Sequence, residues 1–561
     1  MHKQLRLIIP YVTRYRGDLF QAVLILVAAS CISAAIPFLI KLIVDRLHDG
    51  FSRTVIYIVL VTALLALVQA GLKSRARMKI FNSSREIEFE LRRDLHAHLA
   101  SLPYAFFRNH HRGDLIARMM TDVSNIRMMI SMVVLHVSNT IAITALSLAM
   151  MCRLSPSITL LSVIPLCFLF LLMRGFIAPL HRAFTEIQQV NGSLSKQVND
   201  VLAGIRVVKN YLLQAEERTR FDALNAEYMR KTLAATRVWG LLFPMTGFLG
   251  GLGTLAVMWL GGSYLMNHRI TLGDFIALNT YYMMLMWPIA ALGWVLNLYQ
   301  RGVASIQRIE VIYASEVERT GGMVPDAFTG TIAFDQVTVR KEGREVLKNV
   351  SFSLQPGEKL LITGPTGGGK STLLNLVLGL EQDYAGSIRL DGVDIRGIAL
   401  SALRNGIGLV PQEPFLYSAS IRENLFNPAD LEQLIAMAHM REEIDRYDRG
   451  VETVVGERGV TLSGGQKQRL TLARALSKKP RILLLDDPFT HVDGFTEHLV
   501  WEKIEQIVDG MTVIIASSKP VPLPYIDWAA VLVDGEIADY GRVGELLDRN
   551  PYMKLLYEVK G

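Results

Sequence analysis

A glycine-rich loop with a single lysine, GPTGGGKST, occupies residues 364–372 directly after the apolar run KLLIT (359–363). Glycines let a backbone wrap closely around phosphates, and the amides at the start of the following helix add positive potential. We expect Lys370 to reach the β- and γ-phosphates of ATP and Ser371 to ligate Mg²⁺. The predicted phosphate loop consists of Gly364, Pro365, Thr366, Gly367, Gly368, Gly369, Lys370, Ser371 and Thr372.

More residues suited to nucleotide chemistry follow this loop in a fixed order. Gln412, in GLVPQEPFLY (408–417), can sense the γ-phosphate and Mg²⁺. The apolar strand of RILLLDDP (481–488) delivers Asp486 to Mg²⁺, with Asp487 next to it, and Asp493 in HVDG (491–494) has the placement of a D-loop residue. LSGGQ (462–466) opens a helix, and we expect it to form a second anion cradle. That cradle consists of Ser463, Gly464, Gly465 and Gln466.

A further buried strand, TVIIA (512–516), ends at Ser517. Short β-rich runs, glycine turns and alternating helices begin near residue 331, where TIAFDQVTV (331–339), VLKNVSFSL (346–354) and 359–363 are predicted strands. Strands alternating with helices are typical of an α/β domain with a parallel sheet. We therefore assign residues 331–561 to an α/β nucleotide-binding domain.

The first half of the chain has the composition of a membrane protein. Half of the 561 residues are hydrophobic and the mean hydropathy is +0.28. A helix needs about 20 apolar residues to cross a bilayer. Six stretches meet this requirement, at 19–42, 54–72, 128–151, 155–177, 239–265 and 273–298. We assign residues 1–310 to an all-α transmembrane domain and 311–330 to a linker.

The distribution of basic residues predicts the orientation of these spans. The long connection 73–127 carries 11 Lys and Arg residues, whereas the short connections carry only Arg46, Arg53, Arg153 and Arg269. Lys and Arg accumulate in cytoplasmic loops. We expect the N-terminus, both long connections and the nucleotide-binding domain to be cytoplasmic, in a multi-pass protein of the cell (inner) membrane. The net charge of +7 then indicates contact with an anionic leaflet, and no nucleic-acid binding is expected.

The two long connections, 73–127 and 178–238, are predicted to be extensions of the spanning helices into the cytoplasm. The spacing of Ile87, Leu91, Leu95 and Leu99 is helical. Each pair of extensions closes in a short tip, near 106–118 and 211–221, which either docks a motor domain or is a plain solvated hairpin. Methionines and aromatics at 128–132 and 281–287 either line a cavity for apolar molecules or pack between helices.

As a whole, the chain resembles an exporter-type ABC half-transporter, a six-helix membrane domain followed by one ABC-type P-loop ATPase domain. The runs FFRNHHRGDLIARMMTDV (106–123), GIRVVKNYLLQAEERTRF (204–221) and VGERGVTLSGGQKQRLTLARAL (455–476) carry this resemblance. The resemblance implies that two such domains close face to face. Each ATP then lies between the phosphate loop of one chain and the LSGGQ of the other, and closure drives transport.

The chain departs from the family's pattern at three positions. Asp487 stands where the family has a catalytic Glu, Ser517 where it has a His, and Lys341 where it has an aromatic residue that stacks on adenine. Asp is one methylene, about 1.5 Å, shorter than Glu, and a misplacement of this size costs about a hundredfold in rate. The pattern predicts a site that binds ATP and hydrolyses it poorly.

An intact LSGGQ beside a weakened hydrolytic site predicts a heterodimer. In it, this chain's LSGGQ completes a competent site on a partner half-transporter with Glu and His. The expected cargo is amphipathic or hydrophobic, namely a drug, a lipid or a peptide. The alternatives are a homodimeric lipid or drug exporter, an importer with the exporter fold, and an ATP-gated membrane regulator that does not pump.

Overall fold

The computed structural model describes residues 5–47, 50–341, 343–426, 430–456, 459, 461–488, 500–502, 505, 508 and 510–558. The chain divides into two compact units. The helical unit comprises Met1–Ala100 and His111–Ser315, and the second unit comprises Ser101–His110 and Glu316–Gly561. The short segment Ser101–His110 therefore belongs to the second unit, although the sequence places it between two membrane helices.

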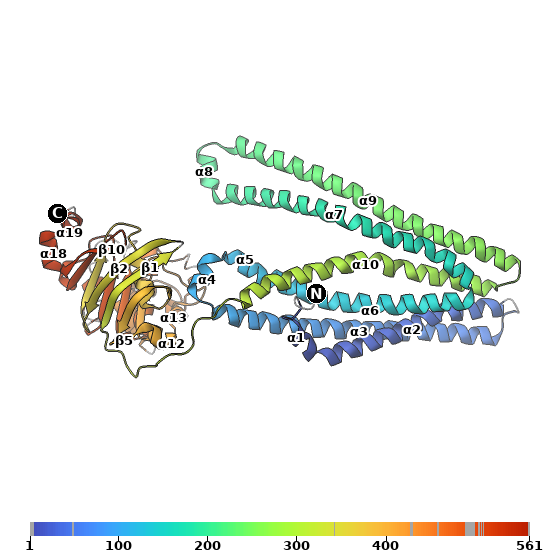
Figure 1. Cartoon of the computed structure of the whole chain (residues 1–561), viewed down its shortest axis with the longest axis horizontal. Coiled ribbons are helices and arrows are strands. Elements are labelled where there is room, and N and C mark those ends of the chain that lie inside the picture. The colour runs from blue at the N-terminus through green and yellow to red at the C-terminus, as the bar shows by residue number, and fades with distance from the viewer. Residues whose placement is uncertain are drawn as a thin grey trace. The chain divides into compact units, whose positions relative to one another are not determined.

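Long helices and a few short helical segments make up the helical unit (Figure 1). They are α1 (Ile9–Arg14), α2 (Arg16–Leu47), α3 (Arg53–Ala100), α5 (Arg112–Ala117), a π-helical turn (Arg118–Asp122), α6 (Val123–Leu154), α7 (Pro156–Ala203), α8 (Ile205–Asn210), α9 (Gln214–Met266) and α10 (Leu272–Tyr313). By length and composition, five helices of the described residues can cross a membrane: Arg16–Leu47, Arg53–Ala100, Arg112–Leu154, Pro244–Met266 and Leu272–Tyr313. Pro156–Leu169 is a shorter apolar helical stretch within the predicted span 155–177.

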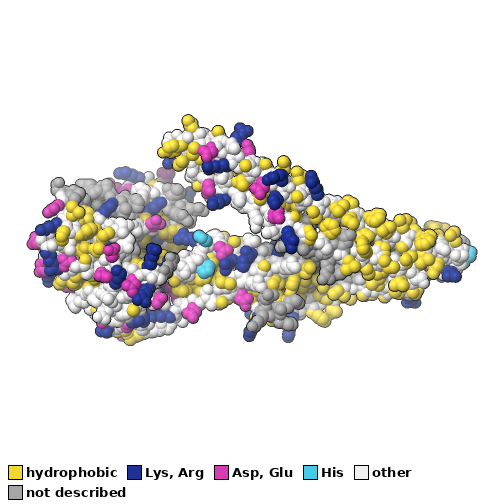
Figure 2. All heavy atoms as spheres, turned by 45° about the horizontal axis from the view of Figure 1, so that its top comes forward, with side chains coloured by type: hydrophobic (Ala, Val, Ile, Leu, Met, Phe, Trp, Pro, Cys, Tyr) yellow, Lys and Arg dark blue, Asp and Glu magenta, His cyan; other side chains and the backbone are white. Residues whose placement is uncertain are grey.

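Helices α7 and α9 pack along each other and are joined by α8 (Figure 1). The chain turns at 204–213, earlier than the predicted 211–221, because α9 already begins at Gln214. Glu216 and Glu217 lie in the first turn of α9, where acidic side chains favour the positive end of a helix dipole. Hydrophobic side chains cover one end of the helical unit, and charged side chains gather towards α8 (Figure 2).

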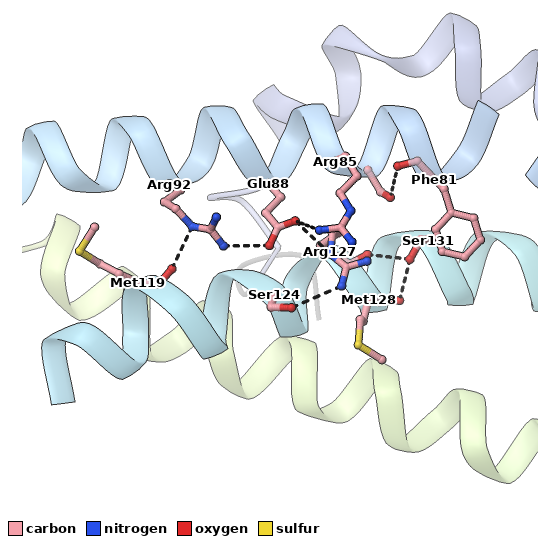
Figure 3. A network of polar contacts seen from close by, with 10 residues as sticks. Phe81, Arg85, Glu88, Arg92, Met119, Ser124, Arg127, Met128 and Ser131 are labelled. Carbon is pink, nitrogen blue, oxygen red and sulfur yellow. Dashed lines mark hydrogen bonds and ion pairs between the residues drawn. The ribbon is translucent and has the colours of Figure 1, made fainter. Parts of the chain in front are cut away.

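A network of charged groups joins α3 to α6 (Figure 3). The Glu88 carboxylate, on a residue only 6% exposed, contacts Arg85 at 3.1 Å, Arg92 at 2.9 Å and Arg127 at 3.1 Å. Arg92 also donates to the backbone carbonyl of Met119 in the π-helical turn. On the same part of α3, the predicted helical face of Ile87, Leu91, Leu95 and Leu99 is buried, as its spacing indicated.

The second unit is an α/β domain that also holds the short helix α4 (Tyr104–Asn109). Its strands are β1 (Ile332–Lys341), β2 (Arg344–Leu354), β3 (Lys359–Thr363), β4 (Ala385–Leu390), β5 (Val393–Asp394), β6 (Ile407–Val410), β7 (Ile482–Asp486), β8 (Thr512–Ala516), β9 (Trp528–Val533) and β10 (Glu536–Arg542). Its further helices are α11 (Lys370–Val377), α12 (Leu400–Asn405), α13 (Ile421–Asn424), α14 (Leu431–Met437), α15 (Arg441–Asp445), α16 (Gly464–Ser477), α18 (Val543–Arg549) and α19 (Pro551–Glu558). The three strands predicted after residue 331 are present.

The described residues of this unit form two sheets. One has the order β2-β1-β4-β5 and the other β10-β9-β3-β8-β7-β6, in which β3, β8, β7 and β6 run parallel. Alternate side chains of β7 and β8 belong to two different hydrophobic clusters, for example Leu483 and Leu484. The central strands are thus buried on both faces. Because their carboxyl ends meet at one edge, the residues that follow β3, β6, β7 and β8 come together there.

Candidate nucleotide site

The phosphate loop follows β3 and leads into α11, as the sequence predicted. Gly364 has φ +144°, and a Cβ at this position would lie 2.0 Å from the carbonyl oxygen of Leu532. Gly369 has φ +100°, and a Cβ there would lie 2.9 Å from the carbonyl oxygen of Val346. Only glycine fits both the conformation and the space at these two positions. The carbonyl oxygens of β9 and β2 therefore leave room only for a tightly wound loop with glycine at these positions.

Lys370 lies folded back into the loop. Its ammonium donates to the carbonyl oxygens of Gly364 at 2.8 Å and Pro365 at 3.0 Å, and the residue is 8% exposed. Burial lowers the pKa of Lys370, against the opposing influence of Asp487 and Asp486. An ammonium that sits among carbonyl dipoles in a glycine loop can exchange them for phosphate oxygens.

Residues suited to Mg²⁺ lie beside the lysine. The Ser371 hydroxyl donates to Asp486 Oδ1 at 3.0 Å, and Asp486 ends β7. Burial raises the pKa of Asp486. Mg²⁺ prefers hard oxygen ligands, such as a hydroxyl and a carboxylate, together with the phosphates of a substrate. Ser371 and Asp486 supply both at the phosphate loop, so these residues fit Mg²⁺. Gln412 is exposed in the loop after β6, at the same edge of the sheet.

Asp487 and Ser517 lie at the ends of the neighbouring strands β7 and β8, and both bond to one backbone turn, 517–519. Asp487 Oδ1 accepts from the backbone N–H of Ser518 at 3.1 Å. The Ser517 hydroxyl donates to the carbonyl of Lys519 at 3.1 Å and accepts from the Lys519 N–H at 3.0 Å. The two side chains expected at the hydrolytic position are thus brought together and held by local backbone contacts.

The LSGGQ cradle forms the start of α16. Ser463 caps the helix: its hydroxyl accepts from the backbone N–H of Gln466 at 3.3 Å, and Gln466 Oε1 accepts from the Ser463 N–H at 2.9 Å. This reciprocal capping box leaves Gly464 and Gly465 at the first two helical positions, where free amides can meet an anion. The D-loop residue Asp493 lies outside the described residues.

Lys341 ends β1, next to the phosphate loop. Its ammonium lies 3.4 Å from Thr372 Oγ1 and 2.8 Å from Glu381 Oε2. The same Glu381 oxygen also accepts from Arg108 of α4 at 3.0 Å. Neither Glu381 nor Arg108 was singled out from the sequence, because their spacing follows no motif and only the folded chain brings them to Lys341.

In the helical unit, part of the predicted methionine cluster lines an apolar pocket between α9 and α10. The pocket has a volume of about 510 Å³, and its lining includes Phe248, Met283 and Met286. Tyr281 and Tyr282 are instead fully buried and bond to the backbone carbonyls of Ala34 and Gly250. Met283 and Met286 thus line a pocket, whereas Tyr281 and Tyr282 pack between helices.

Comparisons with known proteins agree with this geometry. Residues 19–289 match the model of the ABC transporter transmembrane region, and residues 347–490 match that of the ABC transporter family. The probable multidrug resistance ABC transporter ATP-binding/permease protein YheI of Bacillus subtilis is 31% identical over 86% of this chain and 84% of its own length. The multidrug resistance-like ATP-binding protein MdlA of Escherichia coli is 29% identical over 98% of this chain and 94% of its own length.

A solved structure of a bacterial Atm1-family ABC exporter with ATP bound has the same fold. It matches with a TM-score of 0.81 at 23% identity, covering 97% of this chain and 98% of the other. The two matched regions, membrane and ATPase, are fused in one polypeptide. The chain therefore belongs to the ABC transporter family, as an exporter-type half-transporter.

Proposed function

We propose that this chain is one subunit of a heterodimeric, ATP-driven exporter whose own phosphate-loop site binds ATP and hydrolyses it slowly. In this proposal its LSGGQ completes the active site of a partner half-transporter that has the catalytic Glu and His. The domain division 1–310, 311–330 and 331–561, the cytoplasmic orientation and the placement in the inner membrane are part of the same proposal.

One observation carries the proposal. Lys370 is buried and bonds to carbonyls of its own loop, and the half-buried Ser371 and Asp486 bond to each other, whereas Asp487 and Ser517 are short side chains bonded to the turn 517–519. A water-orienting group must come within hydrogen-bond distance of the attacking water. A carboxylate that is one methylene short and already bonded to backbone supports slow hydrolysis without loss of ATP binding.

Each residue of the site has a role in this proposed function. Lys370 and the loop amides would hold the phosphates, Ser371, Gln412 and Asp486 would hold Mg²⁺, and bound Mg²⁺ would neutralise charge on the transferred phosphoryl group. Asp487 would be the carboxylate that orients the attacking water. Ser463 and the amides of α16 would face the ATP of the partner, and Asp493 would lie at the interface.

An amphipathic or hydrophobic cargo is supported by the apolar pocket between α9 and α10. A second pocket, of about 460 Å³, has a lining that includes Leu161, Leu255 and Trp259. Relatives described as multidrug resistance proteins, and a fatty acid ABC transporter of Mycobacterium tuberculosis that is 29% identical, point to the same class of cargo.

The test is the ATPase activity of this chain purified alone, compared with the chain co-expressed with the half-transporter encoded next to it. The proposal expects near-zero activity alone and brisk, cargo-stimulated activity together. Brisk activity alone would support a homodimeric exporter instead. ATP-dependent closure of the assembled dimer without transport of any cargo in vesicles would support the membrane regulator, and inward transport would support the importer.

A further inference from the structure

We propose that Lys341 makes this site recognise a nucleotide through its phosphates instead of its base. The inference rests on the proposed function, since it concerns how the same phosphate-loop site selects its ligand. Lys341 is then the residue that determines nucleotide specificity. The nucleotide phosphate and the Glu381 carboxylate compete for its ammonium.

The first support is the position of the ammonium. Lys341 Nζ lies 3.4 Å from the hydroxyl of Thr372, the third residue of α11. The first turn of that helix carries the free amides that bind phosphate. An ammonium at this point adds a positive charge where the phosphate chain of a nucleotide begins. It offers nothing on which a base can stack.

The second support is the charge balance around Glu381. This residue is 8% exposed, and a single carboxylate oxygen holds both Lys341 at 2.8 Å and Arg108 at 3.0 Å. Two cations on one carboxylate leave one positive charge uncompensated. An anionic phosphate beside Thr372 is the group that would balance it.

The third support is that Lys341 can leave its partner at a low cost. A buried carboxylate stripped of its only cation is strongly destabilised. Glu381 keeps Arg108 when the ammonium turns to a phosphate, so the carboxylate does not lose its last partner. The Lys341 side chain is also 23% exposed, compared with 10% for Glu381, so it is the more accessible member of the pair.

The test measures binding of ATP, GTP, CTP and UTP to the full-length chain in nanodiscs, in EDTA so that no hydrolysis occurs, by displacement of trinitrophenyl-ATP. We expect the four nucleotides to bind within about threefold of each other. Lys341→Met should weaken binding of all four nucleotides by about tenfold. It removes one hydrogen bond from a charged group to phosphate, and the free energy of such a bond corresponds to a change of this size. Lys341→Tyr should favour the purines over the pyrimidines by about tenfold, because larger rings stack over more area.

Two further variants give readouts that a merely structural role would not produce. Glu381→Gln releases the ammonium and should tighten binding of all four nucleotides a few fold, whereas a loss of packing would weaken it. Lys348→Met is the matched control, because Lys348 lies on β2 and pairs with Glu536 at 3.5 Å. It should leave every affinity unchanged.

Each outcome decides between the two proposals. A preference of the unaltered chain for ATP over UTP by more than tenfold, or weaker binding by Glu381→Gln, would overturn the role of Lys341 and leave the nucleotide site intact. No binding of any nucleotide would contradict the site itself. Lys370→Met should weaken binding of all four nucleotides by about a hundredfold, and this separates failure of the site from failure of its indifference to the base.

Discussion

The phosphate-holding and the water-activating parts of the nucleotide site differ in how their side chains are held. Lys370 bonds to two carbonyl oxygens of its own loop, and Ser371 bonds to Asp486 at the end of β7. Asp487 Oδ1 and the Ser517 hydroxyl bond to the backbone of the turn 517–519. Under the proposed function, this difference corresponds to a sheet edge that binds ATP and hydrolyses it slowly.

The largest effect is expected from removing the phosphate-binding charge. Lys370→Met should weaken ATP binding at this chain's own site by about a hundredfold, because a hydrogen bond to a charged group contributes up to about 3 kcal/mol. Photolabelling with azido-ATP, followed by identification of the labelled chain, measures this. Unchanged labelling would remove the loop from the binding site and end the comparison.

A smaller gain is expected from rebuilding the hydrolytic side. The double variant Asp487→Glu, Ser517→His should raise the ATPase rate of this chain purified alone by at least about tenfold, since it restores reach that costs about a hundredfold when misplaced. Steady-state phosphate release reports the rate. The same double variant combined with Lys370→Met is the control and should stay inactive. If the double variant gave no gain in rate, the turn 517–519 would limit hydrolysis in some way other than through the lengths of these two side chains.

A moderate loss is expected at the second cradle. Ser463→Ala removes a helix cap, which costs about 1 kcal/mol of stability, and should lower the ATPase rate of the assembled dimer about fivefold. Ser420→Ala is a matched control because Ser420 forms the same capping box with Glu423 at the start of α13. It should reduce thermal stability similarly and leave the rate unchanged. Equal rates for both variants would argue against a composite site.

The smallest effect is expected from neutralising the short carboxylate. Asp487→Asn should lower the ATPase rate of the assembled dimer by less than about twofold, because the hydrolysis then occurs at the partner's site. Loss of the corresponding Glu in the partner should nearly abolish the rate. If Asp487→Asn alone stopped turnover, the two parts of this site would be equally competent and the heterodimer proposal would be wrong.

The sequence predicted the elements of the fold well because their signals are local. Apolar length predicted six spans, and five helices of the described residues are long and apolar enough to cross a membrane. The order of GPTGGGKST, LSGGQ and RILLLDDP identified the ATPase domain. The second cytoplasmic tip was predicted too late in the chain, at 211–221. A run of charged residues is typical both of such a tip and of the first turn of a helix. Acidic residues at a helix start are stabilised by the dipole, and the helix begins with them.

What the sequence determined by itself was the chemistry available: which residues could hold phosphate, which could hold Mg²⁺, and which positions depart from the residues that the family has there. What only the tertiary structure decided was which partners those residues meet. Lys341, Glu381 and Arg108 are far apart in the chain and share one carboxylate oxygen only after folding. The reason is physical: a motif records contacts with a ligand, whereas a buried charge must find its counter-charge wherever the packed elements place one.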